Sequence, residues 1–166
     1  MRILVAGVGN VFLGDDGFGV AVARYLAGTE LPRGVVVTDF GIRGVHLAYE
    51  LTGGGHDVAI LVDTVARGGP PGTLYVIEPR PGDGPAPFLD AHAMTPETVL
   101  ALAGTLGGET GRVLLVGCEP ADLSPGMELS EPVAAAVAPA ARLVGELIGE
   151  QITSALAGTG RKEKRS

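Results

Sequence analysis

The chain begins with a pattern that predicts a strand, a tight loop and a helix in immediate succession: MRILVAGVGNVFLGDDGFGV. The apolar run from Ile3 to Ala6 predicts a buried strand, and the apolar periodicity from Val20 to Leu26 predicts a helix. The glycines between them allow the positive φ angles and close backbone approach of a short strand-to-helix loop. Asp15 and Asp16 fall at the expected helix start, where the macrodipole favours acidic side chains.

The rest of the chain continues to alternate between strands and helices. Short apolar runs predict further strands at residues 35–38, 58–62, 74–77 and 113–116. Capping and periodicity predict helices at 45–51, 95–106 and from Ser130 onward, with a kink or break at Pro139. This order predicts an α/β fold, a three-layer αβα sandwich with a largely parallel, twisted sheet of about five strands. We expect a single domain over residues 1–157 and a disordered basic tail over residues 158–166.

Composition and charge exclude several classes of protein. The 166 residues are 46% hydrophobic, which is enough for a full core. The net charge is −7, and four of the twelve basic side chains lie in the last six residues, so the body of the chain is strongly acidic. An acidic body argues against a nucleic-acid partner, and apolar runs of strand length argue against a membrane partner. With one cysteine, Cys118, and no apolar signal region, we expect a cytoplasmic protein.

Four acidic residues are expected at one edge of the sheet. Asp39, Asp63 and Glu119 each follow a predicted strand directly, and Asp16 follows the first strand after a loop. Because the carboxyl ends of parallel strands meet at the same edge, this edge is the expected place of a functional site.

Three residues form a candidate metal site: Asp16, Asp63 and His92. Two carboxylates and an imidazole suit Mn²⁺, Zn²⁺, Co²⁺ or Ni²⁺ better than Ca²⁺. Three protein ligands would leave coordination positions open for a substrate. Two plainer interpretations stay open, since Asp63 could cap a helix or loop and His92 could be an ordinary exposed histidine.

Two other site types are weaker alternatives. The segment Gly7-Val8-Gly9 begins like a dinucleotide-binding fingerprint, with Asp39 as the ribose ligand, but Phe12 stands where the third glycine belongs. Cys118 could be a nucleophile with His92 as its base, but its place at the end of an apolar strand favours a small buried residue.

Five sequence blocks resemble those of the hydrogenase maturation proteases, the endopeptidases that trim the large subunit of [NiFe] hydrogenases. The blocks occur in the family's order over most of residues 1–145: RILVAGVGNVFLGDDGFGV, LVDTV around Asp63, AHAMTPETVL around His92, VGCEP and LSEPV. Many members have glutamate where this chain has Asp16, which keeps the charge but shortens the reach by one methylene.

The resemblance implies an endopeptidase that removes the C-terminal extension of a nickel-loaded large-subunit precursor. In that family the metal ligands correspond by motif position to Asp16, Asp63 and His92, and Asp39 lies in a family-like block as a secondary candidate. Nickel would come with the substrate, and other divalent metals could substitute for it. A non-catalytic, nickel-dependent chaperone of the precursor is the alternative, because it would use the same ligands.

Overall fold

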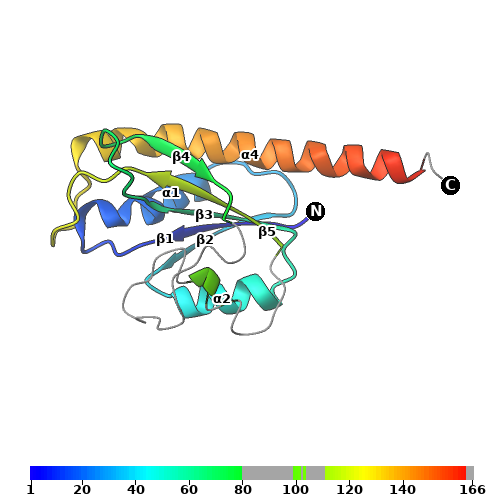
Figure 1. Cartoon of the computed structure of the whole chain (residues 1–166), viewed down its shortest axis with the longest axis horizontal. Coiled ribbons are helices and arrows are strands. Elements are labelled where there is room, and N and C mark those ends of the chain that lie inside the picture. Colours follow the sequence, from blue (N-terminus) through cyan, green and yellow to red (C-terminus); the bar gives the residue numbers. More distant parts are fainter. Residues whose placement is uncertain (80–98, 102, 104–110, 164–166) are drawn as a thin grey trace.

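The protein is an α/β sandwich built on one five-stranded sheet (Figure 1). The computed structural model describes residues 1–79, 99–101, 103 and 111–163. In chain order the strands are β1 (Ile3–Val8), β2 (Val35–Gly41), β3 (Val58–Thr64), β4 (Leu74–Ile77) and β5 (Arg112–Cys118). Their order in the sheet is β2-β1-β3-β5-β4, and every pairing is parallel except that of the edge strand β4. The predicted fold class is therefore confirmed.

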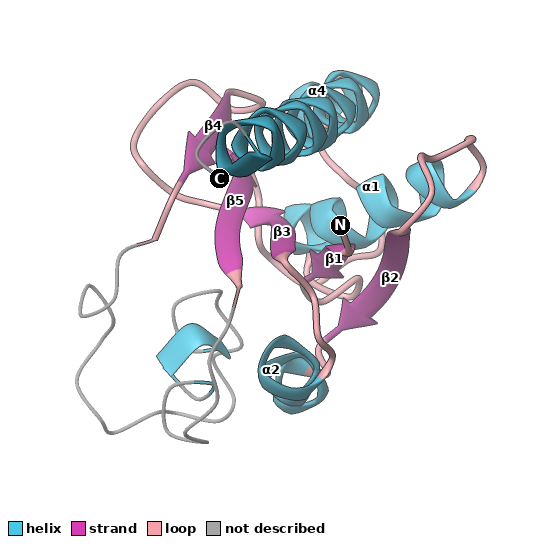
Figure 2. Ribbon diagram, turned by 90° about the vertical axis from the view of Figure 1, so that its right-hand side faces the viewer, coloured by secondary structure: helices cyan, strands magenta, loops and turns pink. Residues whose placement is uncertain are grey.

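Helices cover both faces of the sheet. Their bounds are η1 (a 3₁₀ turn, Gly14–Gly17), α1 (Phe18–Ala27), α2 (Gly44–Gly53) and α4 (Glu131–Glu163). Figure 2 shows α1 and α4 on one face and α2 on the other. Residues 99–101 and 103, inside the predicted helix 95–106, are helical, and the rest of that segment lies outside the described residues.

Successive side chains of the central strands point to opposite faces of the sheet, so the hydrophobic core has two parts, one on each face. In β1, Ile3 and Val5 pack with α1 and α4, whereas Leu4 and Ala6 pack with α2. All four are at most 1% exposed. A strand that is buried on both faces must be apolar throughout, which is why these strands were visible in the sequence as continuous apolar runs.

The start of α1 differs from the sequence prediction. The helix begins at Phe18, and Asp15 and Asp16 lie before it in η1 instead of in its first turn. Helix α1 packs tightly on the sheet near its start, since a side chain at Gly19 would clash with the carbonyl oxygens of Val8 and Val62. The absence of a side chain at Gly19 therefore lets α1 approach both β1 and β3.

Helix α4 is longer and more continuous than predicted. It passes through Pro139 without a break and continues beyond residue 157, the predicted end of the domain, to Glu163. Of the expected kink or break, the break is therefore wrong, and the kink stays a prediction. The N–H missing at Pro139 would have bonded to the carbonyl of Ala135, and Ala135 is exposed, so water can satisfy that oxygen. Figure 1 shows the end of α4 projecting past the sheet.

The composition of α4 also satisfies a simple test for a membrane span. Among the described residues, Glu131–Gly158 is long and apolar enough, with a mean hydropathy of 1.3. Its large apolar residues, however, form the face that packs on the sheet, where Val133, Val144 and Ile148 are buried. A core helix passes the same test, so this is weak evidence for a membrane partner.

We predict that Pro139→Ala stabilises the protein. Alanine restores the hydrogen bond to Ala135 and removes the steric cost of proline inside a helix, so the free energy of unfolding should rise by about 1–3 kcal/mol. Urea denaturation measures it. Pro132→Ala is the matched control, because proline is tolerated in the first turn of α4 and little change is expected there. A loss of stability in Pro139→Ala would contradict this account of α4.

Candidate functional site

The direction in which the chain adds strands to the sheet reverses between β1 and β3. From β1 the chain leaves by α1 towards β2 on one side, whereas from β3 it leaves towards β4 and β5 on the other side. Such a reversal separates the two outgoing loops and is the usual place of a site in an open α/β sheet. Asp16 lies in η1, which follows β1, and Asp63 is the second-last residue of β3.

The carboxylate of Asp16 is held by both of its oxygens. Its Oδ2 accepts a hydrogen bond from the backbone N–H of Asn10 at 2.8 Å, and its Oδ1 accepts one from the hydroxyl of Thr64 at 3.3 Å. The side chain is half-buried. It is therefore oriented by the structure but still reachable from solvent.

Asp63 lies beside it and is almost fully buried, with 4% exposure. Its Oδ1 accepts a hydrogen bond from the backbone N–H of Thr64 at 2.7 Å. Thr64 thus contacts both carboxylates: its backbone N–H donates to Asp63, and its hydroxyl donates to Asp16. The structure brings the two predicted aspartates together.

Gly9 makes this close approach possible. Its φ is 134°, a value that residues with a side chain rarely adopt. A Cβ there would also clash with the main-chain oxygen of Asp16 and would lie 3.3 Å from Oδ1 of Asp63. Any side chain at position 9 would push the two acidic residues apart.

The neighbouring acid, Asp15, has a structural role. It is fully buried and accepts hydrogen bonds from the backbone N–H groups of Ala121, Asp122 and Ser130 and from the hydroxyl of Ser130. Burial raises the pKa of Asp15, but these hydrogen bonds outweigh it and bring the pKa below its ordinary value of 3.8. Asp15 therefore ties η1 to the loop between β5 and α4.

Glu119 is also an anchor, although it lies at the predicted edge. Its carboxylate is 5% exposed and accepts hydrogen bonds from the backbone N–H groups of Arg67 and Gly68 and from the hydroxyl of Tyr75. The bond from Arg67, with smaller contributions from Gly68 and Tyr75, lowers the pKa of Glu119 in spite of its burial. It fixes the segment that follows Asp63 along the chain.

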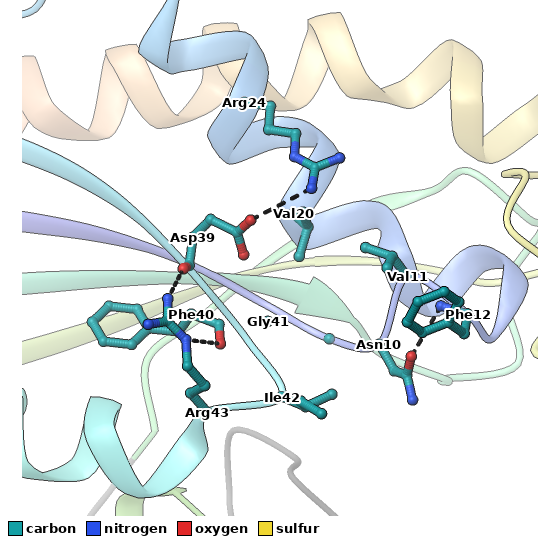
Figure 3. Close-up of a pocket in the computed structure, with 11 residues that line it drawn as sticks. Asn10, Val11, Phe12, Val20, Arg24, Asp39, Phe40, Gly41, Ile42 and Arg43 are labelled. Carbon is teal, nitrogen blue, oxygen red and sulfur yellow. Dashed lines mark hydrogen bonds and ion pairs between the residues drawn. The ribbon is translucent and has the colours of Figure 1, made fainter.

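Asp39, the secondary candidate, is not part of this cluster. It lies in β2, where its register partner is Gly7 of β1, and Gly7 pairs on its other side with Val62 of β3. Strand β1 therefore separates Asp39 from Asp63. The carboxylate of Asp39 instead faces Arg24 of α1, with an Oδ2–Nη2 distance of 3.8 Å (Figure 3).

The third predicted ligand, His92, lies outside the described residues, so its place in the site stays a prediction. Within the described ranges no group of three or more His, Cys, Asp and Glu side chains could hold a metal ion. Asp16 and Asp63 do fit such a role as a pair, because they are adjacent, oriented oxygen donors of the kind that divalent cations bind.

The alternative sites lose support. The nucleotide alternative needs free N–H groups in the loop after β1, but those of Gly9, Asn10 and Phe12 already donate to Gly41, Asp16 and Asn10. The thiol of Cys118 is buried in the core, and burial together with Asp15 and Glu119 raises its pKa to about 11. Such a thiol is an inert core residue, not a nucleophile.

Comparison with known proteins places the chain among hydrogenase maturation enzymes. The profile of the family described as "Hydrogenase maturation protease" matches residues 20–146. The hydrogenase expression/formation protein HoxM of Azotobacter vinelandii is 34% identical, over 98% of this chain and 80% of that protein. The maturating endopeptidase HybD of E. coli superposes with a TM-score of 0.73 and 30% identity, over 91% of this chain and 94% of that one. A hydrogenase 2 maturation peptidase from a Thaumarchaeota archaeon gives a TM-score of 0.68 and 36% identity, over 90% and 99% of the two chains.

The stabilities of two variants test whether Asp15 has a structural role that its neighbour Asp16 lacks. In Asp15→Asn an NH₂ group replaces a buried acceptor, so the free energy of unfolding should fall by about 2–4 kcal/mol. Asp16→Asn is the matched control, with a change of at most about 1 kcal/mol expected for a half-buried side chain. Chemical denaturation of both variants measures the difference. Equal stabilities would contradict the structural role of Asp15.

The contribution of Asp15 to the free energy of unfolding should also depend on pH, and the pKa shift gives the direction of that dependence. Because the pKa of Asp15 is lower in the folded protein than in the unfolded chain, its ionised form stabilises the fold above about pH 4, and this contribution is lost as the pH falls through the folded value. Asp15→Asn lacks that group. Its stability should therefore decrease less than that of the wild type between about pH 6 and pH 3.

Proposed function

Because the chain belongs to the hydrogenase maturation protease family, we propose that it removes the C-terminal extension of a [NiFe]-hydrogenase large-subunit precursor after nickel has been inserted. As a member of that family it is a protease and therefore a hydrolase. The observation that best supports the specific reaction is the pairing of Asp16 and Asp63 through Thr64 at the carboxyl ends of β1 and β3.

In this proposal Asp16, Asp63 and His92 bind nickel that the precursor already holds. The metal belongs to the substrate, and at this site it would anchor the scissile segment and supply Lewis acidity to its carbonyl or to a water molecule. Positioning alone can lower a reaction barrier by several kcal/mol. Anchoring of the scissile segment by the metal would therefore be enough to accelerate its cleavage. Other divalent cations could replace nickel at oxygen and imidazole donors.

The chain's own residues prepare this site before the substrate arrives. The N–H of Asn10 and the hydroxyl of Thr64 each hold one oxygen of Asp16, which fixes the plane of the carboxylate. Thr64 also holds Oδ1 of Asp63. Groups that orient metal ligands in this way commonly change metal affinity 10–100-fold when they are lost.

The partner in this proposal is the precursor, and the reaction takes place in the cytoplasm. A lone cysteine that is buried and free agrees with a reducing compartment. The alternative function, a chaperone that binds the nickel-loaded precursor without cutting it, uses the same ligands and is separated only by a cleavage assay.

Intact mass spectrometry of a cognate precursor tests the proposal. The nickel-loaded precursor should lose a discrete C-terminal peptide on incubation with this protein, and the nickel-free precursor should not. Complex formation without a change of mass would favour the chaperone. The absence of both binding and cleavage would contradict the proposed function.

Variants of the ligands extend this test. Asp16→Ala, Asp63→Ala and His92→Ala should each abolish the mass change and leave the circular dichroism spectrum intact. Leu156→Ala, an exposed residue on the projecting end of α4, is the matched surface control and should process normally. Retained processing in His92→Ala would remove that residue from the assignment.

We predict a separate effect for Thr64. Thr64→Val keeps the shape and the backbone N–H but loses the hydroxyl that holds Asp16, so the affinity for nickel-loaded precursor should fall about 10-fold. Thr64→Ser keeps the hydroxyl and should stay within about 3-fold of the wild type. Biolayer interferometry measures both, with unfolding midpoints as the check on structure. Equal affinities for the two variants would contradict the orienting role of Thr64.

A further inference from the structure

A pocket of about 280 Å³ lies beside the loop after β1 (Figure 3). Its walls come from that loop, from α1 and from the end of β2, and they include Phe12, Val20, Arg24, Asp39, Ile42 and Arg43. The volume is slightly below the range of about 300–1,000 Å³ that is usual for sites enclosing a whole small molecule. It is a suitable size for one or two side chains of a peptide.

The charged part of this pocket is net positive. Arg24 is 3.8 Å from Asp39, so these two charges offset each other. Arg43 has no carboxylate partner among the described residues, because its Nε and Nη2 donate to the main-chain oxygens of Phe40 and Asp39. Its Nη1 has no acceptor in the described part of the chain. In a protein with a net charge of −7, this is a local site for an acidic group.

The opposite wall is apolar and open to solvent. Phe12 is 61% exposed and Ile42 is 60% exposed, although both are large hydrophobic residues. Figure 3 shows Phe12 on the side away from Arg24, Asp39 and Arg43, with Ile42 between them. An apolar wall next to a guanidinium that has no carboxylate partner among the described residues fits a peptide that carries an apolar and an acidic side chain close together.

The pocket shares two wall residues with the site of the paired aspartates. Gly9 and Asn10 line the pocket, and the same two residues contact the site, Asn10 through its N–H bond to Asp16 and Gly9 through its close approach to Asp63. An extended peptide advances about 3.3 Å per residue, so a few residues are enough to cross this shared wall.

From these observations we infer that the pocket binds a segment of the precursor close to the scissile bond, with an acidic side chain on Arg43 and an apolar side chain against Phe12 and Ile42. This inference rests on the proposed function for the identity of the partner. It assigns Arg43 and Phe12 to substrate binding and gives them no part in the bond-breaking step.

The test compares two charge reversals of equal size. Arg43→Glu should weaken binding of the nickel-loaded precursor at least 10-fold at low salt, with a smaller loss at high salt because the contact is electrostatic. Arg33→Glu is the matched control, since Arg33 is exposed in the loop before β2, at the end of that strand away from Arg43, and should change binding less than 2-fold. Phe12→Ala tests the apolar wall without touching a charge and should weaken binding at least 5-fold.

Compensating changes in the precursor identify the acidic partner. Each Asp or Glu within about ten residues of the cleavage site is changed to Lys, and one of these precursors should bind Arg43→Glu better than it binds the wild type. Equal effects of Arg43→Glu and Arg33→Glu, or a loss that no single reversal restores, would overturn the inference. So would a wild type that binds no precursor.

Binding and cleavage are measured separately, so the two proposals can fail independently. If the wild type binds the precursor, Arg43→Glu does not, and neither changes its mass, the pocket is upheld and the protease function is rejected. If the wild type cleaves and Arg43→Glu cleaves with an unchanged KM, the function is upheld and the pocket is rejected. Circular dichroism of Arg43→Lys and Arg43→Glu checks that both remain folded.

Discussion

A buried carboxylate holds the functional edge of this protein together. Asp15 accepts four hydrogen bonds from the loop between β5 and α4, and it is the residue directly before Asp16. Those bonds fix η1 against a segment more than 100 residues away in the sequence, and so they fix where Asp16 points. The two acids differ in their roles: Asp15 is buried and stabilises the fold, whereas Asp16 is held in one orientation and remains accessible to a ligand.

The sequence was sufficient for the architecture and for the approach of Asp16 to Asp63. Central strands that are buried on both faces must be apolar throughout, so β1, β3 and β5 appeared as uninterrupted apolar runs. Parallel strands collect their carboxyl ends at one edge, so the approach of Asp16 and Asp63 followed from the order of the elements. The strands and the approach of the two aspartates could be predicted because they follow from local patterns, the apolar runs and the order of the elements, that the tertiary contacts do not override.

Other features could not be predicted because they depend on contacts between distant residues. Motif position selected Asp16 as the candidate ligand, but the structural role of Asp15 could not be predicted, since its donors lie 106 to 115 positions away. The role of Thr64 requires the side chain of Asp16, 48 positions earlier in the chain. Asp39 follows the same strand-end pattern as Asp63, yet β1 lies between them. The continuity of α4 through Pro139 likewise depends on the packing of its buried face.

The central claim is that nickel held by the precursor is bound directly by Asp16 and Asp63. X-ray absorption at the nickel edge, on the rapidly frozen complex of precursor and protein, tests it most directly. We predict that complex formation adds oxygen or nitrogen neighbours at about 2.0–2.2 Å from nickel, as for carboxylate and imidazole ligands of similar cations, and that a complex made with Asp16→Ala has fewer of them. An unchanged nickel spectrum on formation of the wild-type complex would contradict the claim.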